Sequence, residues 1–134
     1  RLLRLEKLEA NPRSLSLEAV LDALYRPAFE FTHASARNAR EIQGMLALLF
    51  REPPELVRPL LGALFHDVTE RYLAALARLV PELPRELLEL RYHLGIGAMI
   101  HLLADRGPEF PVRDPHEYAD QLVAFVAAAL RGTR

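Results

Sequence analysis

The sequence predicts an all-α protein of six helices. Apolar residues recur every three or four positions along most of the 134 residues, and prolines and glycines separate these stretches. No segment alternates apolar and polar residues with the period of a strand. The chain is 51% hydrophobic and 26% charged, which is typical of one globular domain that buries its own core.

The opening helix is predicted over residues 1–10. Leu2, Leu5 and Leu8 lie on one stripe of this helix, and Asn11 begins the turn that ends it. The helical rhythm starts at the first residue with no capping residue before it. We therefore expect this stretch to be the end of a longer helix.

The second and third helices follow after short breaks. Ser14 or Ser16 can cap the second helix, in which Pro27 removes a backbone donor and should cause a bend. A break over residues 35–38 then precedes the third helix, which is predicted over residues 39–51.

The last three helices are also bounded by prolines. A long fourth helix is predicted over residues 55–79 and a fifth over residues 86–105. The fifth is apolar on nearly all sides in its second half and carries Gly95 and Gly97, which permit a close helix contact. Asp114 has the position and chemistry of an N-cap for the sixth helix.

Composition excludes several classes of function. Seventeen basic residues against 18 acidic ones leave a formal net charge of -1, which argues against phosphate-backbone binding by this chain alone. Zero cysteines exclude disulfides and thiol catalysis. No apolar run approaches the roughly 20 residues of a membrane span, and no signal-peptide pattern opens the chain. We therefore expect a cytoplasmic protein with no membrane partner.

Candidates for catalysis and metal binding are weak. Four histidines, His33, His66, His93 and His101, fall in predicted helices, and three of them have a carboxylate four residues away. This spacing can orient an imidazole or form half of a metal site, but no HExxH pattern is present. No nucleophile elbow or phosphate-binding glycine loop occurs. We expect no metal, no cofactor, no catalytic residue and no enzymatic activity.

Three stretches are similar to parts of one known family: RLLRLEKL at residues 1–8, SLEAVLDALYRPAFEF at residues 16–31, and PELPRELLELRYHLGIGAMIHLLAD at residues 81–105. Together they resemble the C-terminal, ligand-sensing and dimerising domain of TetR-family transcriptional repressors. The last stretch is most similar to the subgroup that includes regulators of fatty-acid metabolism.

The resemblance implies two segments with different roles and a dimer. Residues 1–10 would be the linking helix from a missing helix-turn-helix domain, and residues 11–134 would be the effector-binding and dimerisation domain. Operator DNA would then be bound only by the intact protein, through the missing domain. The last two helices would form a four-helix bundle with a second subunit. The residues predicted at this homodimer interface are Leu94, Gly95, Ala98, Leu102, Leu122, Phe125, Val126 and Ala129.

The same resemblance implies a ligand cavity among the second to fifth helices. Its predicted lining is mostly apolar and aromatic with a few polar groups. The residues are Tyr25, Phe29, His33, Met45, Leu49, Phe65, Thr69, Tyr72, His93 and Gly97. Arg37, Arg40 or Arg58 would hold an anionic head group if the fold brings one of them to the mouth of the cavity.

The sequence therefore predicts the effector-sensing domain of a bacterial TetR-type repressor. Its ligand would be small and hydrophobic, with a fatty acyl chain or an acyl-CoA as the first candidate. Two alternatives stay open: a ligand-free structural dimerisation module, and a helical metal-dependent enzyme that uses His66, His93 or His101.

Overall fold

The computed structural model describes residues 1–104 and 114–132, and all regular structure in these ranges is helical. The six α-helices are α1 (Leu2–Ala10), α2 (Leu17–His33), α3 (Ala36–Arg51), α4 (Pro54–Leu79), α5 (Arg85–Leu103) and α6 (Pro115–Arg131), with a short 3₁₀ turn at Pro12–Ser14. The predicted fold class, all-α with six helices, is confirmed.

Serine side chains cap two of the helices. Ser16 caps α2, because its hydroxyl oxygen accepts a hydrogen bond from the Ala19 amide at 3.1 Å. Ser35 caps α3 in the same way by accepting from the Asn38 amide at 3.1 Å. The predicted break at residues 35–38 is therefore wrong, since this cap lets α3 begin at Ala36.

The last two helices differ little from their predicted limits. Asp114 caps α6 by accepting a hydrogen bond from the His116 amide at 2.9 Å. Helix α5 begins at Arg85 and runs to Leu103, and the predicted end at residue 105 lies outside the described residues. Helix α2 continues through Pro27 as one helix.

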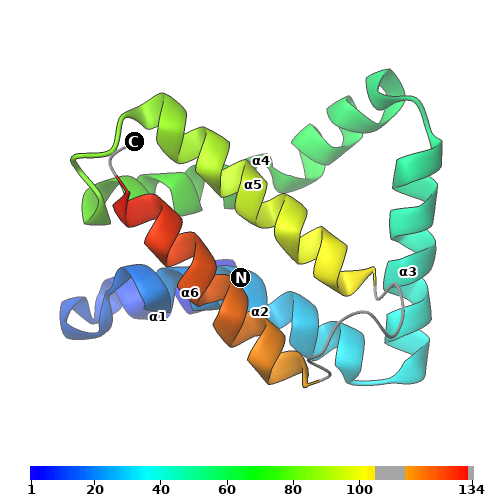
Figure 1. Ribbon diagram of the computed structural model, residues 1–134, viewed down its shortest axis with the longest axis horizontal. Coiled ribbons are helices and arrows are strands. Elements are labelled where there is room, and N and C mark those ends of the chain that lie inside the picture. The colour runs from blue at the N-terminus through cyan, green and yellow to red at the C-terminus, as the bar shows by residue number, and fades with distance from the viewer. Residues whose placement is uncertain (105–113, 133–134) are drawn as a thin grey trace.

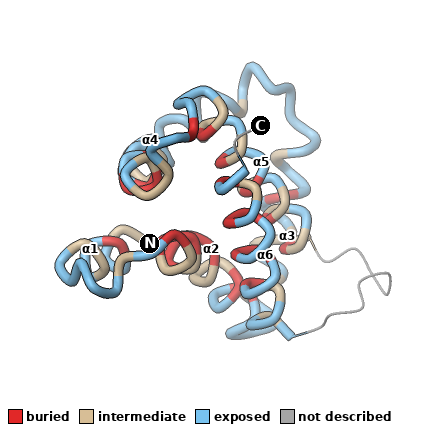
Figure 2. The backbone as a smooth tube through the Cα atoms, turned by 60° about the vertical axis from the view of Figure 1, so that its left-hand side comes forward, coloured by how far each residue is buried: buried red, intermediate tan, exposed pale blue. Residues whose placement is uncertain are grey.

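Helix α2 lies at the centre of the molecule and contacts each of the other five helices. Helices α5 and α6 run side by side, and α3 lies at the opposite end of the molecule from α1, where it contacts α2 and α5 (Figure 1). The buried residues concentrate on α2, α5, α6 and the C-terminal half of α4 (Figure 2). By contrast, Leu46 is the one buried residue of α3, and the first half of α4 has none.

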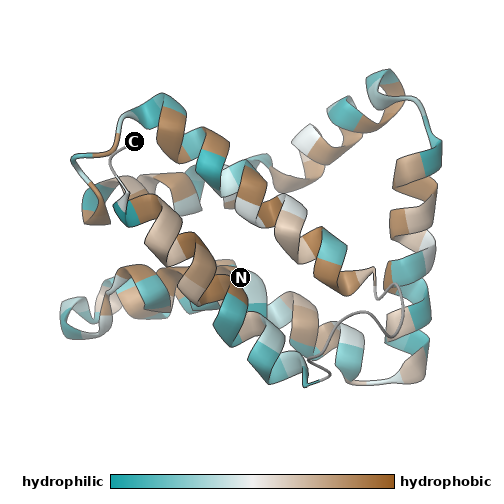
Figure 3. Ribbon diagram, viewed as in Figure 1, coloured by the Kyte–Doolittle hydropathy of each residue, from teal (hydrophilic) through white to brown (hydrophobic). Residues whose placement is uncertain are grey.

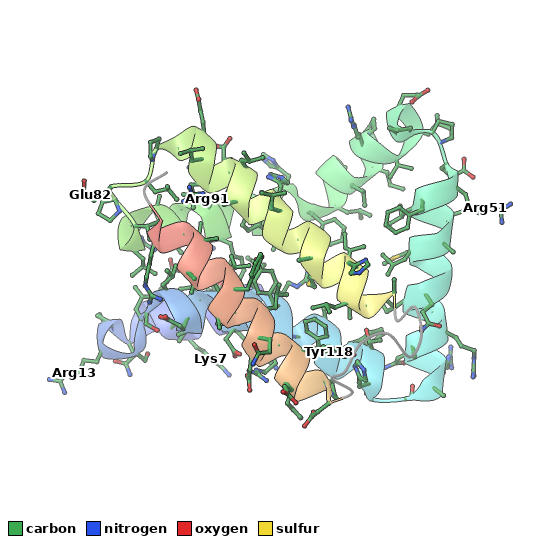
Figure 4. All side chains as sticks on the ribbon, in the orientation of Figure 1. Lys7, Arg13, Arg51, Glu82, Arg91 and Tyr118 are labelled. Atoms are coloured by element: carbon green, nitrogen blue, oxygen red, sulfur yellow. The ribbon has the colours of Figure 1, made fainter. Side chains whose placement is uncertain are left out.

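Arginine side chains of α2 and α5 form hydrogen bonds to α6. Arg26 donates to Asp22 one turn away and to Asp120 of α6. Arg91 lies between α5 and the C-terminal end of α6 (Figure 4), where its guanidinium donates to the carbonyl oxygens of Ala129 and Gly132. The two hydrogen bonds from Arg91 satisfy carbonyl groups at the C-terminal end of α6 that have no partner inside the helix.

The closest approach between α2 and α5 occurs at Gly95. Tyr25 is fully buried, and its hydroxyl oxygen lies too close to the position of a Cβ atom on residue 95 for the two to fit without a shift. The same Cβ would lie 3.1 Å from a methyl group of Val126 in α6. Gly95 therefore permits a packing distance that no larger residue allows.

Gly95→Ala is expected to destabilise the fold by about 1–3 kcal/mol, because the added methyl group overlaps the Tyr25 hydroxyl and forces α2 and α5 apart. The free energy of unfolding from chemical denaturation measures this effect. Gly97→Ala is the matched control, since a Cβ at residue 97 meets no atom within 4 Å. It should be neutral or stabilising by up to about 1 kcal/mol from helix propensity. Equal effects of the two variants would contradict the close contact.

Candidate functional site

The predicted ligand-binding residues fall into three groups in the structure. Tyr25, Phe29 and Tyr72 are buried in the core. A second group lies on α3 and α4 and is partly or largely exposed: Met45, Leu49, Phe65 and Thr69. A third group is exposed on α2 and α5: His33, His93 and Gly97. The structure thus brings the first two groups to the inner side of the fold and leaves the third outside.

Helices α3 and α4 expose an unusual number of large apolar side chains. Met45 is 47% exposed and Phe65 is 42% exposed. The others on these two helices are Leu48, Phe50, Leu56, Leu60 and Leu64. Contiguous exposed apolar surface on a globular protein commonly marks a binding site for a ligand or a partner. We call these seven residues the α3–α4 apolar surface.

A polar cluster lies where α1, α2, α4 and α5 meet. Arg1 is half-buried, and its guanidinium is 3.7 Å from the sulfur atom of Met99. The Tyr72 hydroxyl donates to the Arg1 carbonyl oxygen at 2.8 Å. Tyr25 and Tyr92 complete the group, since both are close enough for the charge of Arg1 to affect their pKa values. We call Arg1, Tyr25, Tyr72 and Tyr92 the tyrosine–arginine cluster.

Burial dominates the electrostatics of this cluster. It raises the pKa of Tyr72 to about 12 and also raises the pKa values of Tyr25 and Tyr92, because a phenolate is poorly solvated there. The same burial lowers the pKa of Arg1, although the phenols partly oppose this shift. The cluster therefore holds neutral phenols around one cation at neutral pH.

Hydrogen bonding inside the cluster is incomplete. The Tyr72 hydroxyl is satisfied by Arg1, and the side chains of Tyr92 and Thr69 are hydrogen-bonded to each other. The Tyr25 hydroxyl has no hydrogen-bond partner although it is buried. Buried polar groups are nearly always paired, so an unpaired one needs a reason.

Two hollows among the described residues lie next to α2 and α6, and neither is between α3 and α4. An open groove of about 880 Å³ runs between α1, α2 and α6, with side chains of Lys7, Asp22 and Val123 in its walls. A smaller hollow of about 230 Å³ lies between α2 and the start of α6, and Phe29 and His33 line it. Tyr118 of α6 lies beside this hollow and packs on Phe29, with ring centroids 6.3 Å apart (Figure 4).

The three arginines predicted as candidates for binding an anionic head group are exposed at the surface. Arg37 pairs with Glu41 on the surface of α3, and Arg40 and Arg58 are exposed. Arg1, which the sequence assigned only to the linking helix, is a half-buried basic side chain that contacts Met99 of α5. Its position depends on how α1 packs against α4 and α5, and no local pattern shows this.

The predicted dimer-interface residues occupy two sides of α5 and α6. Leu94 and Phe125 are exposed, and Ala98, Leu102 and Ala129 are half-buried. Gly95, Leu122 and Val126 lie in the core of the chain itself, where they pack between α2, α5 and α6. The exposed members belong to an outer face that also carries Leu90 and Gly97.

Helices α5 and α6 carry many apolar residues along their length (Figure 3), and several of these are exposed on the outer face. Phe125 is 66% exposed, and both Leu90 and Leu94 are more than half exposed. Ala124 and Ala128 flank Phe125 and are also exposed, so the surface of α6 is shallow there. We call Leu90, Leu94, Gly97, Ala124, Phe125 and Ala128 the α5–α6 outer face.

Residues 1–104 and 114–132 contain neither a cluster of metal ligands nor a helix suited to a membrane span. No group of three or more histidine, aspartate or glutamate side chains within residues 1–104 and 114–132 could hold a metal ion. Within the same ranges, no helix combines the length and the apolar character that crossing a bilayer requires.

The six helices define an all-α domain with a buried polar cluster and two exposed apolar surfaces. Residues 22–129 match the family described as the tetracyclin repressor-like C-terminal domain, so the chain belongs to this family. Comparisons with curated proteins and with solved structures give no significant match. The family supports a ligand-binding and dimerisation role in a regulator.

Alkaline pH is expected to destabilise the fold through the buried phenols. Their pKa values are raised above the ordinary value of 10. The contribution of the neutral buried phenols to the free energy of unfolding is therefore complete below pH 10 and is lost as pH rises towards 12. Tyr72 alone should account for about 1 kcal/mol of unfolding free energy lost at pH 11. Denaturant titration at several pH values, with tyrosinate absorbance as a second signal, measures this.

Tyr72→Phe provides the control. The variant lacks one titrating phenol, so its unfolding free energy should depend less steeply on pH above 10 than that of the wild type. Ionisation of all four tyrosines near pH 10 while the protein stays folded would show that the cluster is not buried.

Proposed function

We propose that this chain is the effector-sensing and dimerisation domain of a bacterial TetR-type transcriptional repressor in the cytoplasm. Residues 1–10 would link it to a DNA-binding domain of the intact protein, and residues 11–134 would bind the effector and a second subunit. The effector would be a small hydrophobic molecule, with a fatty acyl chain or an acyl-CoA as the first candidate. Family membership together with two separate exposed apolar surfaces carries this proposal.

The α5–α6 outer face supports the dimer. A domain of this size rarely leaves several large apolar side chains exposed on two adjacent helices unless a partner covers them. Alanines around Phe125 allow a second helix to approach closely. Pairing of this face with the same face of a second copy would give a four-helix bundle with two-fold symmetry.

The α3–α4 apolar surface supports a hydrophobic effector. Phe65, Thr69 and Tyr72 share one face of α4 and connect this surface to the tyrosine–arginine cluster. A ligand lying along this face would contact apolar side chains for most of its length and polar groups at one end, which is the usual composition of a small-molecule site.

Helix α1 is attached to the helices that would respond to the effector. Glu9 pairs with Arg71 and Arg78 of α4, and Arg4 pairs with Glu30 of α2. A change in how α2 and α4 pack would therefore move α1 and the DNA-binding domain beyond it. Such coupling requires an effector that binds one arrangement of the helices more tightly than the other.

One observation favours a ligand-free structural module instead. Tyr25 packs directly on Gly95, and of the ten predicted cavity residues Phe29 and His33 alone line either of the two hollows described above. In this alternative, the α3–α4 apolar surface would serve protein contacts, and no small molecule would enter the fold.

Native mass spectrometry of the purified chain tests both parts of the proposal. The expected result is a dimer mass with an organic adduct of lipid size, or a dimer that gains such an adduct after incubation with fatty acids or acyl-CoAs. Phe125→Glu should give a monomer, because burying a carboxylate in an apolar interface is strongly unfavourable.

Leu3→Glu is the matched control. Leu3 is 74% exposed on α1, away from the α5–α6 outer face, so this variant should remain a dimer. A dimer of Phe125→Glu would contradict the proposed interface. A dimer of the wild type that binds none of the ligands would favour the structural module.

A further inference from the structure

Arg1 holds a charge inside the fold without a countercharge. Among residues 1–104 and 114–132, no carboxylate lies within 4 Å of its guanidinium, although ten such ion pairs form elsewhere. Its one side-chain partner is the sulfur atom of Met99 at 3.7 Å, and a thioether is a weak acceptor. Partial burial of an unpaired cation is unfavourable, which makes this position unusual.

Tyr25 presents an unused hydrogen-bond donor about one turn of α5 away from this cation, since its hydroxyl packs on Gly95 and Arg1 contacts Met99. Tyr72 and Tyr92 have partners for their hydroxyl groups, whereas the fully buried hydroxyl of Tyr25 has none. A guanidinium and a phenol are both hydrogen-bond donors, and an oxygen that carries negative charge can accept from both. Within the described ranges the chain does not supply one.

We propose that Arg1 and Tyr25 bind the anionic head group of the effector. This inference rests on the proposed sensing function and specifies the chemical class of its ligand: an amphipathic anion with a carboxylate or phosphate group. The guanidinium would exchange its weak contact with Met99 for charge-assisted hydrogen bonds to the anion. The Tyr25 hydroxyl would donate a further hydrogen bond.

The face of α4 that carries Tyr72 offers the apolar tail a direction away from this head-group site. Phe65 lies two helical turns before Tyr72 on the same face of α4, a distance of about 10 Å along the helix. Phe65 belongs to the α3–α4 apolar surface, whose other members include Leu64 and Met45. A tail of medium length would therefore reach from the tyrosine–arginine cluster to this surface.

The site would also connect the effector directly to α1. Arg1 immediately precedes Leu2, the first residue of α1, and its carbonyl oxygen accepts hydrogen bonds from Tyr72 and from the Leu5 amide. An anion bound to the guanidinium would thus fix the position of α1 relative to α4. The residue that recognises the ligand would be part of the helix that transmits the signal.

Calorimetric titration of the full chain with alkyl carboxylates and with alcohols of the same chain lengths tests the inference. Decanoate and decanol are one matched pair, and several other lengths cover the unknown tail. We expect the wild type to bind the best carboxylate about tenfold or more tightly than the matching alcohol. Arg1→Met should remove most of this preference, and Tyr25→Phe should reduce it without lowering the melting temperature of the free protein.

Arg4→Met is the matched control. Arg4 is on the same helix, but its guanidinium pairs with Glu30 at the surface, so the preference for the carboxylate should persist. Titration with the corresponding acyl-CoA distinguishes the source of the anion. Tighter binding of acyl-CoA that is lost in Arg1→Met would assign a phosphate head group, whereas binding of the carboxylate alone would assign a free fatty acid.

Two results would overturn the inference. If alcohols bind as tightly as carboxylates and acyl-CoAs, or if Arg1→Met keeps the wild-type preference, the anion site is wrong while hydrophobic effector sensing stands. If neither series nor the acyl-CoAs bind at any chain length, both the head-group site and the fatty-acyl sensing function fail.

Discussion

The contact between Tyr25 and Gly95 sets the distance between α2 and α5, and much of the domain depends on it. Helix α2 touches every other helix, so its position relative to α5 determines how α1, α4 and α6 can pack around both. The contact also buries the Tyr25 hydroxyl without a partner. One close approach thus shapes the core and leaves a polar group there that stability alone does not explain.

The structure has two separate exposed apolar surfaces, and we assign a different function to each. The α5–α6 outer face belongs to helices whose inner sides are firmly packed, as expected for a rigid interface between subunits. The α3–α4 apolar surface belongs to the part of the chain with the fewest buried residues. Regions with few buried contacts open more easily, which suits ligand entry. In our account, dimerisation uses the well-packed side of the domain and sensing uses the loosely packed side.

Helical periodicity was sufficient to predict the fold class and most helix limits, because both depend on local spacing and capping. It failed at residues 35–38, where Ser35 caps α3 earlier than the break suggested. The site was less accessible from sequence. Periodicity marks Leu122, Val126 and Gly95 as apolar or small, but it does not say whether the neighbouring α2 or a second subunit covers them. Arg1 was missed as an interior residue because only the packing of α1 against α4 and α5 places it there.

The central claim is that effector binding in the interior is coupled to α1. Hydrogen exchange of the α1 amides, measured with and without the best-binding alkyl carboxylate, tests this most directly. We predict slower exchange across residues 2–10 on binding, together with slower exchange in the second half of α4. Protection confined to α3 and α4, with α1 unchanged at saturating ligand, would contradict the coupling and leave a binding site without a signalling role.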